Sequence, residues 1–88
     1  MHYLAYVVGE NPAKTLAKYY GDLWDWYAVG GRWGHLSRLP RTKLPVPSYI
    51  IYQGSDGVSF DEVGEDRMKK ALGAISPKDR ITVVDLHM

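Results

Sequence analysis

Four short apolar stretches, separated by glycine, proline and polar residues, set the pattern of this chain. They cover residues 2–8 (HYLAYVV), 23–29 (LWDWYAV), 48–53 (SYIIYQ) and 80–88 (RITVVDLHM). β-branched and aromatic residues dominate these stretches, which favours strands at such lengths. Gly9 ends the first stretch, and Gly30 with Gly31 ends the second. We therefore expect four strands.

A first helix is predicted between the first two strands, within residues 11–21 (NPAKTLAKYYG). Asn11 is a good N-cap, and Pro12 suits the first helical position, where its missing N–H is not needed. Apolar residues then recur at helical spacing, and Gly21 is a plausible stop. The segment predicts a short helix.

A second helix is predicted over residues 60–75, where apolar residues again follow helical spacing. Ser59 and Glu62 have the S-x-x-E spacing of a capping box, and the first turn is acidic, which suits the helix dipole. Gly64 weakens this helix by up to about 1 kcal/mol. A start nearer Glu65 therefore stays open.

The resulting order is β-α-β-β-α-β, with a loop over the proline-rich residues 34–47 and a turn at 54–57 (GSDG). Right-handed crossovers convert this order into a ferredoxin-like α+β fold. We expect a four-stranded antiparallel sheet with strand order 4-1-3-2 and both helices on one face. A chain of 88 residues predicts a single domain, 1–88.

Composition narrows the chemistry. The chain has no cysteine, which excludes disulfides and sulfur-bound zinc, and no motif for another metal or a cofactor is present. The first residues lack a leader pattern and there is no run of about 18 apolar residues, so we expect a cytoplasmic protein without a membrane span. The net charge of +1 makes nucleic acid an unexpected partner.

The stretch WDWYAVGGRW, residues 24–33, holds all three tryptophans. Strand alternation places Trp24 and Trp26 on one face, either in the core or on an open face that contacts a partner. The two glycines at its end allow close backbone approach, and Arg32 could fork onto a phosphate or carboxylate. Alternatively, the glycines only end a strand and Arg32 pairs with Asp25 or Asp85.

The last strand places Asp85 and His87 two residues apart on one face. They could orient each other, act as a base or bind a metal, although a metal site would also need His2 or His35. The alternative is a strand end that emerges into solvent. No nucleophile elbow, phosphate loop or carboxylate dyad accompanies them, which favours a role other than catalysis.

The aromatic stretch resembles the W-D-W-Y-x-x-G-G-R-W block of a family of uncharacterised proteins common in bacteriophages and prophages. The ending VVDLH similarly resembles the V-V-D-x-H tail of that family. Its members are usually longer, with a large insert between block and tail, and Leu86 stands where they often have cysteine. The resemblance implies one shared framework of residues: Trp24, Asp25, Trp26, Gly30, Gly31, Arg32, Trp33, Asp85 and His87.

In the expected strand order, block and tail occupy opposite edges of the sheet. They could meet only if the Gly-Gly-Arg-Trp segment folded back across the sheet or if two chains paired. A homodimer through an open face or an edge strand is therefore predicted.

Three functions follow from these observations. The first is a phage-type accessory protein that binds a host or defence protein, or an anionic nucleotide-like ligand. The second is a small enzyme using Asp85 and His87 with Arg32, and the third is a virion or other structural component. The predicted ligand-binding residues are Trp24, Trp26, Arg32, Trp33, Asp85 and His87.

Overall fold

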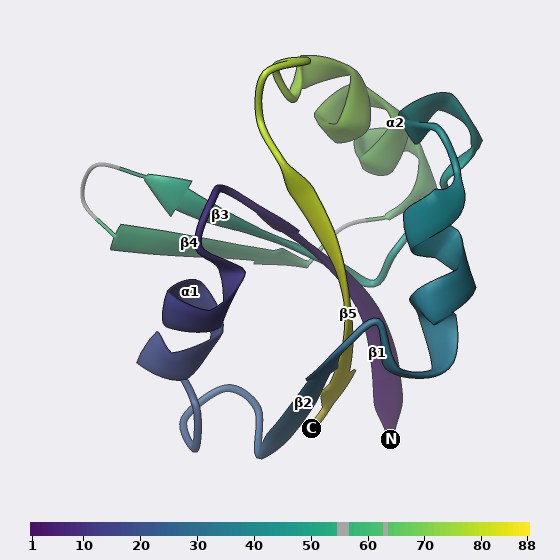
Figure 1. The fold of residues 1–88 in the computed structure, drawn as a ribbon. Helices are drawn as coiled ribbons and strands as arrows, with labels where there is room; N and C mark the ends of the chain where they lie inside the picture. Colours follow the sequence, from purple (N-terminus) through teal and green to yellow (C-terminus); the bar gives the residue numbers. More distant parts are fainter. Residues whose placement is uncertain (55–56, 63) are drawn as a thin grey trace.

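The computed structural model describes residues 1–54, 57–62 and 64–88 and contains one mixed sheet with helices packed on it (Figure 1). The described strands are β1 (His2–Val8), β2 (Trp26–Val29), β3 (Tyr49–Gly54), β4 (Gly57–Glu62) and β5 (Ile81–His87). The α-helices are α1 (Pro12–Lys18) and α2 (Glu65–Ala74), and two 3-10 helices are η1 (Gly31–Arg38) and η2 (Arg41–Lys43).

The described strands lie in the order β2-β5-β1-β3-β4. β1 pairs antiparallel with β5 along its whole length and parallel with β3. The α+β class is confirmed, and so are the predicted neighbours of the first strand. The ferredoxin-like antiparallel sheet is not confirmed, because β1 and β3 are parallel and β2 pairs with β5 instead of β3.

The segment between β2 and β3 explains this difference. It was predicted to be a loop, but it contains η1 and η2 and carries the chain from one edge of the sheet to the far side of β1. The parallel pair is β1 with β3, and such a pair needs a connection of a dozen or more residues; residues 9–48, which contain α1, β2, η1 and η2, supply it. β2 and β3 are joined by this long segment and lie on opposite sides of the β5–β1 pair.

The second helix begins at Glu65, which was the alternative to a start at residue 60, and residues 57–62 form β4. The apparent capping box, Ser59 with Glu62, therefore lies in a strand. Val58 and Phe60 alternate with polar residues, a period of two that suits a strand as well as a helix turn. β3 and β4 flank the predicted turn, of which residues 55–56 lie outside the described part of the chain.

The first helix agrees with its sequence signals. The Asn11 side chain accepts a hydrogen bond from the Lys14 N–H at 3.2 Å, and Pro12 is the first helical residue. The helix ends at Lys18, before the predicted stop at Gly21.

The helices cover opposite faces of the sheet, so the prediction that both lie on one face is wrong. The α1 face is built from Ala5, Val7, Leu16, Trp24, Ile51, Val84 and Leu86. The other face, which we call the η1 face, is built from Leu4, Tyr6, Val8, Leu36, Ile50, Ile75 and Val83. The alternation of β1 fits this arrangement, since its odd and even residues are both apolar and each set fills one core.

Tyr6 fixes the loop before β3 to the η1 face. Its ring is fully buried, and its hydroxyl donates to the Pro45 carbonyl at 2.5 Å. Burial raises the pKa of Tyr6 to about 12, so the hydroxyl stays a donor at physiological pH.

Candidate functional site

The aromatic stretch and the tail lie side by side in the ladder between β2 and β5. Trp26 pairs with His87, and Ala28 pairs with Asp85. On the other side of β5, His2 of β1 also pairs with His87. The prediction that block and tail occupy opposite edges of the sheet is therefore wrong, because β2 adds to the free side of β5.

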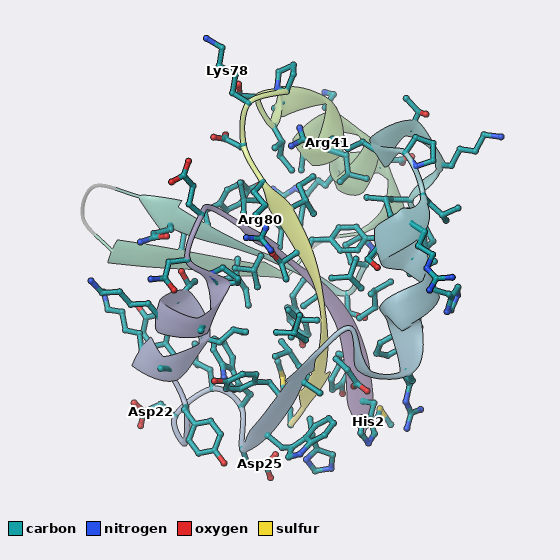
Figure 2. The ribbon with its side chains drawn as sticks, in the orientation of Figure 1. His2, Asp22, Asp25, Arg41, Lys78 and Arg80 are labelled. Atoms are coloured by element: carbon teal, nitrogen blue, oxygen red, sulfur yellow. The ribbon has the colours of Figure 1, made fainter. Side chains whose placement is uncertain are left out.

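One end of the η1 face gathers these polar and aromatic side chains. The His2 ring lies 5.3 Å from the Trp26 ring and 5.3 Å from the His87 ring, centroid to centroid, each pair edge to face. Figure 2 shows His2 and Asp25 at the same end of the molecule. We call the group the junction cluster; its members are His2, Asp25, Trp26, Arg32, Asp85 and His87.

Asp85 is the buried centre of the junction cluster, with only 2% of its surface exposed. Its Oδ1 lies 2.7 Å from His2 Nδ1. Its Oδ2 accepts the Arg32 backbone N–H at 3.3 Å, and the Arg32 Nε lies 3.7 Å away. A buried carboxylate is strongly destabilising without such partners, so Asp85 ties β1 and the start of η1 to β5.

Gly31 makes this approach possible. It has a φ of +52°, and a Cβ placed on it would lie 2.4 Å from the Asp85 Cβ and 2.7 Å from Oδ2. A side chain at this position would therefore occupy the space of the carboxylate. The close approach expected of the glycine pair is present, and it delivers the Arg32 N–H to Asp85.

His87 forms a second histidine–carboxylate pair. Its Nδ1 lies 2.6 Å from the Asp25 Oδ1, and the Asp25 N–H donates to the His87 carbonyl at 3.1 Å. The hydrogen bond from His87 holds the pKa of the Asp25 carboxyl below its usual range. Unlike Asp85, Asp25 is exposed to solvent.

The two carboxylates set the tautomers of the two imidazoles. An ionised carboxylate only accepts hydrogen bonds, so Nδ1 of His2 and of His87 carries the proton. In a neutral ring the Nε2 atom is then the free base, as in the histidine–carboxylate pairs of hydrolases. Sequence spacing paired Asp85 with His87; the structure pairs Asp85 with His2 and His87 with Asp25.

Arg32 carries a fixed positive charge at the edge of the junction cluster. Its side chain is 57% exposed, and its guanidinium carbon lies 5.8 Å from the centre of the Trp33 ring. Trp33 is half-buried and packs against the η1-face core. Arg32 is therefore held between the Asp85 carboxylate and an aromatic ring while more than half of its side chain stays exposed.

Trp24 does not belong to the junction cluster. β2 begins only at Trp26, and Trp24 lies 1% exposed in the core of the α1 face, where its Nε1 donates to the Leu16 carbonyl at 3.1 Å. The predictions that Trp24 shares a face with Trp26 and contacts a ligand are therefore corrected. Trp26, by contrast, is 42% exposed.

Sequence reasoning left His2 and Asp25 out of the predicted ligand-binding set. A usable signal existed for His2: the first and last strands were expected to be antiparallel neighbours, which brings the start of the first near the end of the last, and the structure pairs His2 with His87. No comparable signal exists for Asp25, because its contact depends on the neighbour that β2 selects.

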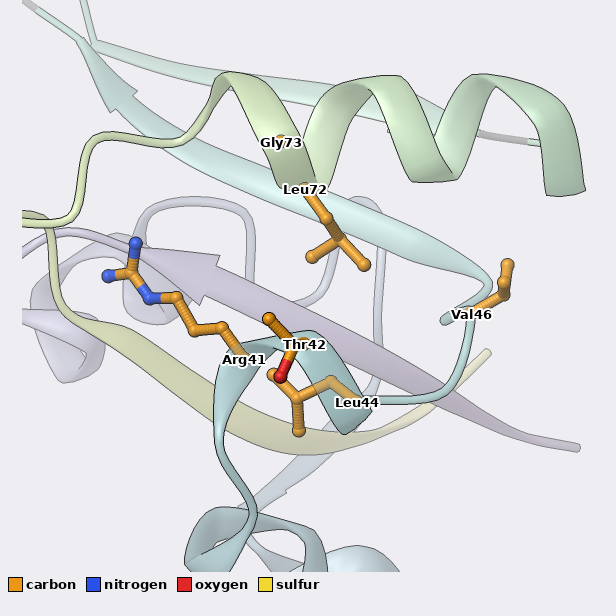
Figure 3. Close-up of a pocket in the computed structure, with 6 residues that line it drawn as sticks. All are labelled: Arg41, Thr42, Leu44, Val46, Leu72 and Gly73. Atoms are coloured by element: carbon orange, nitrogen blue, oxygen red, sulfur yellow. The ribbon is translucent and has the colours of Figure 1, made fainter.

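Two hollows lie on the surface, the first away from the junction cluster and the second next to the start of η1, where Val29, Gly30 and Gly34 line it. One, of about 360 Å³, lies between η2 and α2 and is lined by Arg41, Thr42, Leu44, Val46, Leu72 and Gly73 (Figure 3). The Arg41 guanidinium there donates to the Ser76 carbonyl at 2.7 Å. The other, of about 490 Å³, adjoins Arg80 and the start of β5. The junction cluster itself forms an open surface, and we place the candidate site there because its charges and hydrogen bonds converge.

Within the described part of the chain, no group of three or more histidine, aspartate or glutamate side chains is arranged to hold a metal ion. In the junction cluster, both Nδ1 atoms face carboxylates instead of a common point. No described helix is long and apolar enough to cross a membrane. Comparison of the chain with protein-family models, with curated proteins and with solved structures gives no match.

Proposed function

We propose that the junction cluster binds a small anionic ligand of the nucleotide class. The observation that carries this proposal is the buried Asp85 carboxylate, which holds Arg32 and also holds His2, whose ring lies against the exposed Trp26. The sequence resemblance favours a phage-type accessory protein as the setting. The host or defence protein suggested as a partner stays a prediction.

The chemistry of the cluster supports an anion. Asp85 is buried and surrounded by donors, and the groups of the cluster that reach solvent are the Arg32 guanidinium, the rings of His2 and His87, and the Asp25 carboxylate that pairs with His87. A guanidinium matches the geometry of a phosphate with two parallel hydrogen bonds. An imidazole adds a donor when it is protonated.

Trp26 supplies the surface for a base. It lies against the His2 ring edge to face and keeps 42% of its surface exposed. Stacking of a nucleobase on an exposed aromatic ring contributes about 1–3 kcal/mol. A phosphate at Arg32 and a base at Trp26 together describe a mononucleotide.

Calorimetry against a panel of nucleotides tests the proposal. We expect a nucleotide to bind wild type and Arg32→Ala to weaken binding at least about tenfold, because a charge-assisted hydrogen bond contributes roughly 1.5–3 kcal/mol. Trp26→Ala weakens nucleotides more than it weakens inorganic phosphate. Arg38→Ala, at the other end of η1, is the matched control and leaves binding unchanged. Absence of any nucleotide binding, or equal binding by Arg32→Ala, contradicts the proposal.

A second candidate function is acid–base hydrolysis of a phosphodiester. The observation that favours it is the pair of carboxylate-oriented imidazoles whose rings lie 5.3 Å apart. One neutral ring would take a proton from an attacking water or hydroxyl as the new P–O bond forms. The other, protonated, would give its proton to the oxygen that leaves.

A pH–rate profile distinguishes this enzyme from a binding protein. Hydrolysis by two imidazoles gives a bell-shaped profile, and His2→Ala and His87→Ala each abolish turnover while the midpoint of thermal unfolding shows that the chain is folded. His35→Ala, an exposed histidine of η1, is the control. Nucleotide binding without turnover would leave binding as the function of the site.

A further inference from the structure

β2 is an edge strand with an unusually apolar sequence. It is the first strand in the order of the described sheet, and its residues Trp26–Val29 (WYAV) carry no charge. Trp26 is 42% and Val29 60% exposed, and Tyr20 and Leu23 in the preceding loop are also exposed. Edge strands are normally protected by charge, proline or a cover, as Asp61 and Glu62 provide in the sequence of β4 at the opposite edge.

The hydrogen bonds of β5 show which backbone groups of β2 point outward. The Met88 N–H donates to the Met1 carbonyl, and the Gly9 N–H donates to the Arg80 carbonyl. The even-numbered residues of β5 therefore direct their backbone N–H and C=O groups toward β1. The backbone groups of its odd-numbered residues then point toward β2, as the hydrogen bond from the Gly30 N–H to the Val83 carbonyl confirms. By the same alternation, Tyr27 and Val29 direct their N–H and C=O groups to the free edge.

We propose that β2 pairs antiparallel with β2 of a second copy of this chain, forming one continuous sheet around a two-fold axis at Ala28. This register is the one that joins the outward groups: Tyr27 exchanges hydrogen bonds with Val29 of the partner subunit, and Val29 with the partner subunit's Tyr27. An aromatic ring then faces a β-branched side chain on the α1 face, a favourable cross-strand pair.

Charge complementarity selects a second copy over an unrelated strand. An acidic residue, Asp25, precedes β2, and a basic residue, Arg32, follows it shortly after the strand ends. Antiparallel self-pairing about Ala28 brings the Asp25 end of each strand to the end of the partner subunit's β2, where the chain turns at Gly30 into η1 and Arg32 follows. The acidic end of each strand thus lies at the basic end of the other, although Asp25 stays paired with His87 and Arg32 with Asp85 within each chain.

Sedimentation as a function of concentration tests the dimer. We expect the mass to rise from the monomer value of 10.0 kDa toward twice that value in the micromolar range, because a four-residue strand pair buries less than the roughly 1,600 Å² of a standard interface. Val29→Pro removes an outward N–H while leaving the ladder to β5 intact, and it keeps the chain monomeric. Val29→Thr, which retains the N–H, still dimerises.

Cross-linking tests the register. The chain has no cysteine, so a single introduced thiol reports only on its symmetry mate. Ala28→Cys places two Cα atoms about 4.5 Å apart across the axis, which suits a disulfide, and we expect rapid oxidation to a covalent dimer. Val29→Cys is more exposed but faces the partner subunit's Tyr27, so it cross-links more slowly.

Three results would overturn the proposal. One is a wild-type chain that stays monomeric up to millimolar concentration. Another is a Val29→Pro chain, folded by circular dichroism, that dimerises as wild type does. The third is faster cross-linking of Val29→Cys than of Ala28→Cys. Random collisions would give this order, because residue 29 is the more exposed of the two. The sedimentation experiment does not use the Ala28→Cys chain, so it tests the proposal even if that variant fails to fold.

Discussion

At the scale of single residues, the molecule is organised around one buried carboxylate. Asp85 accepts a hydrogen bond from the Arg32 backbone, lies against the Arg32 guanidinium and pairs with the His2 ring. The residues that satisfy it are also the ones that present charge to solvent. Structural stability and ligand recognition are therefore coupled at this position, and substitutions here must be assayed for both.

Gly31→Ala tests how closely the backbone approaches Asp85. The new Cβ would lie 2.4 Å from the Asp85 Cβ, and the φ of +52° is unfavourable for alanine. We expect a loss of about 2–5 kcal/mol in the free energy of unfolding, from backbone strain and overpacking together. Urea denaturation measures this loss.

Gly34→Ala is the matched control. It lies in the same 3-10 helix, its φ is not positive, and a Cβ there meets nothing within 4 Å. We expect a change within about 1 kcal/mol, of either sign. Equal destabilisation by the two substitutions would show that general helix propensity, and not the approach to Asp85, explains the requirement for Gly31.

Residue-level sequence reasoning succeeded where the chemistry was local. The glycine pair implied a close backbone approach, and pairing of Arg32 with Asp85 was among the stated alternatives. It was wrong for Trp24 because alternation was extended through a strand that begins two residues later. The Trp24 indole is buried, and the hydrogen bond to the Leu16 carbonyl satisfies its one polar group.

At the scale of elements, the periodic signals identified β1, β5, α1 and α2, but they extended α2 back to residue 60 and did not identify β4. Alternating and helical patterns overlap over short segments, so residues 57–62 could be read either way. Whether these residues form a strand or a helix depends on whether a neighbouring strand is present to pair with them. β4 pairs with β3, and that interaction lies outside any local pattern.

The neighbour of β2 was likewise beyond local reasoning. Its four residues fit any open edge, and either β3 or β5 could have accepted them. Residues 30–48 decide between the two, because η1 packs over one face and its first residues are bonded to Asp85. The fold class could thus be predicted from periodicity, and the site only in part, since its geometry depends on this choice.

At the scale of the whole molecule, two thin cores share one sheet. Each face of β1 contributes to a different core, and each core is completed by a different helical segment. The junction cluster occupies the end of the η1 face where that core stops and the sheet becomes polar. The proposed dimer would extend the same sheet and bring two clusters to one continuous surface.

The pairing of β1 with β5 has a consequence for how the chain folds. The central pair of the sheet joins Met1 to Met88, so its formation closes nearly the whole chain into a loop. Contacts between residues far apart in sequence require a large loss of chain entropy before their favourable interactions form, and this slows folding. We expect the junction cluster to form late in folding, with the association of these two strands.

A circular permutant tests this expectation. A short linker from Met88 to Met1 turns β5 and β1 into a hairpin, and new ends fit in the exposed turn at residues 76–79. We expect folding to accelerate roughly ten- to a hundredfold in stopped-flow experiments, because the longest loop becomes one of the shortest. An unchanged folding rate would mean that β1 and β5 meet only after the rate-limiting step.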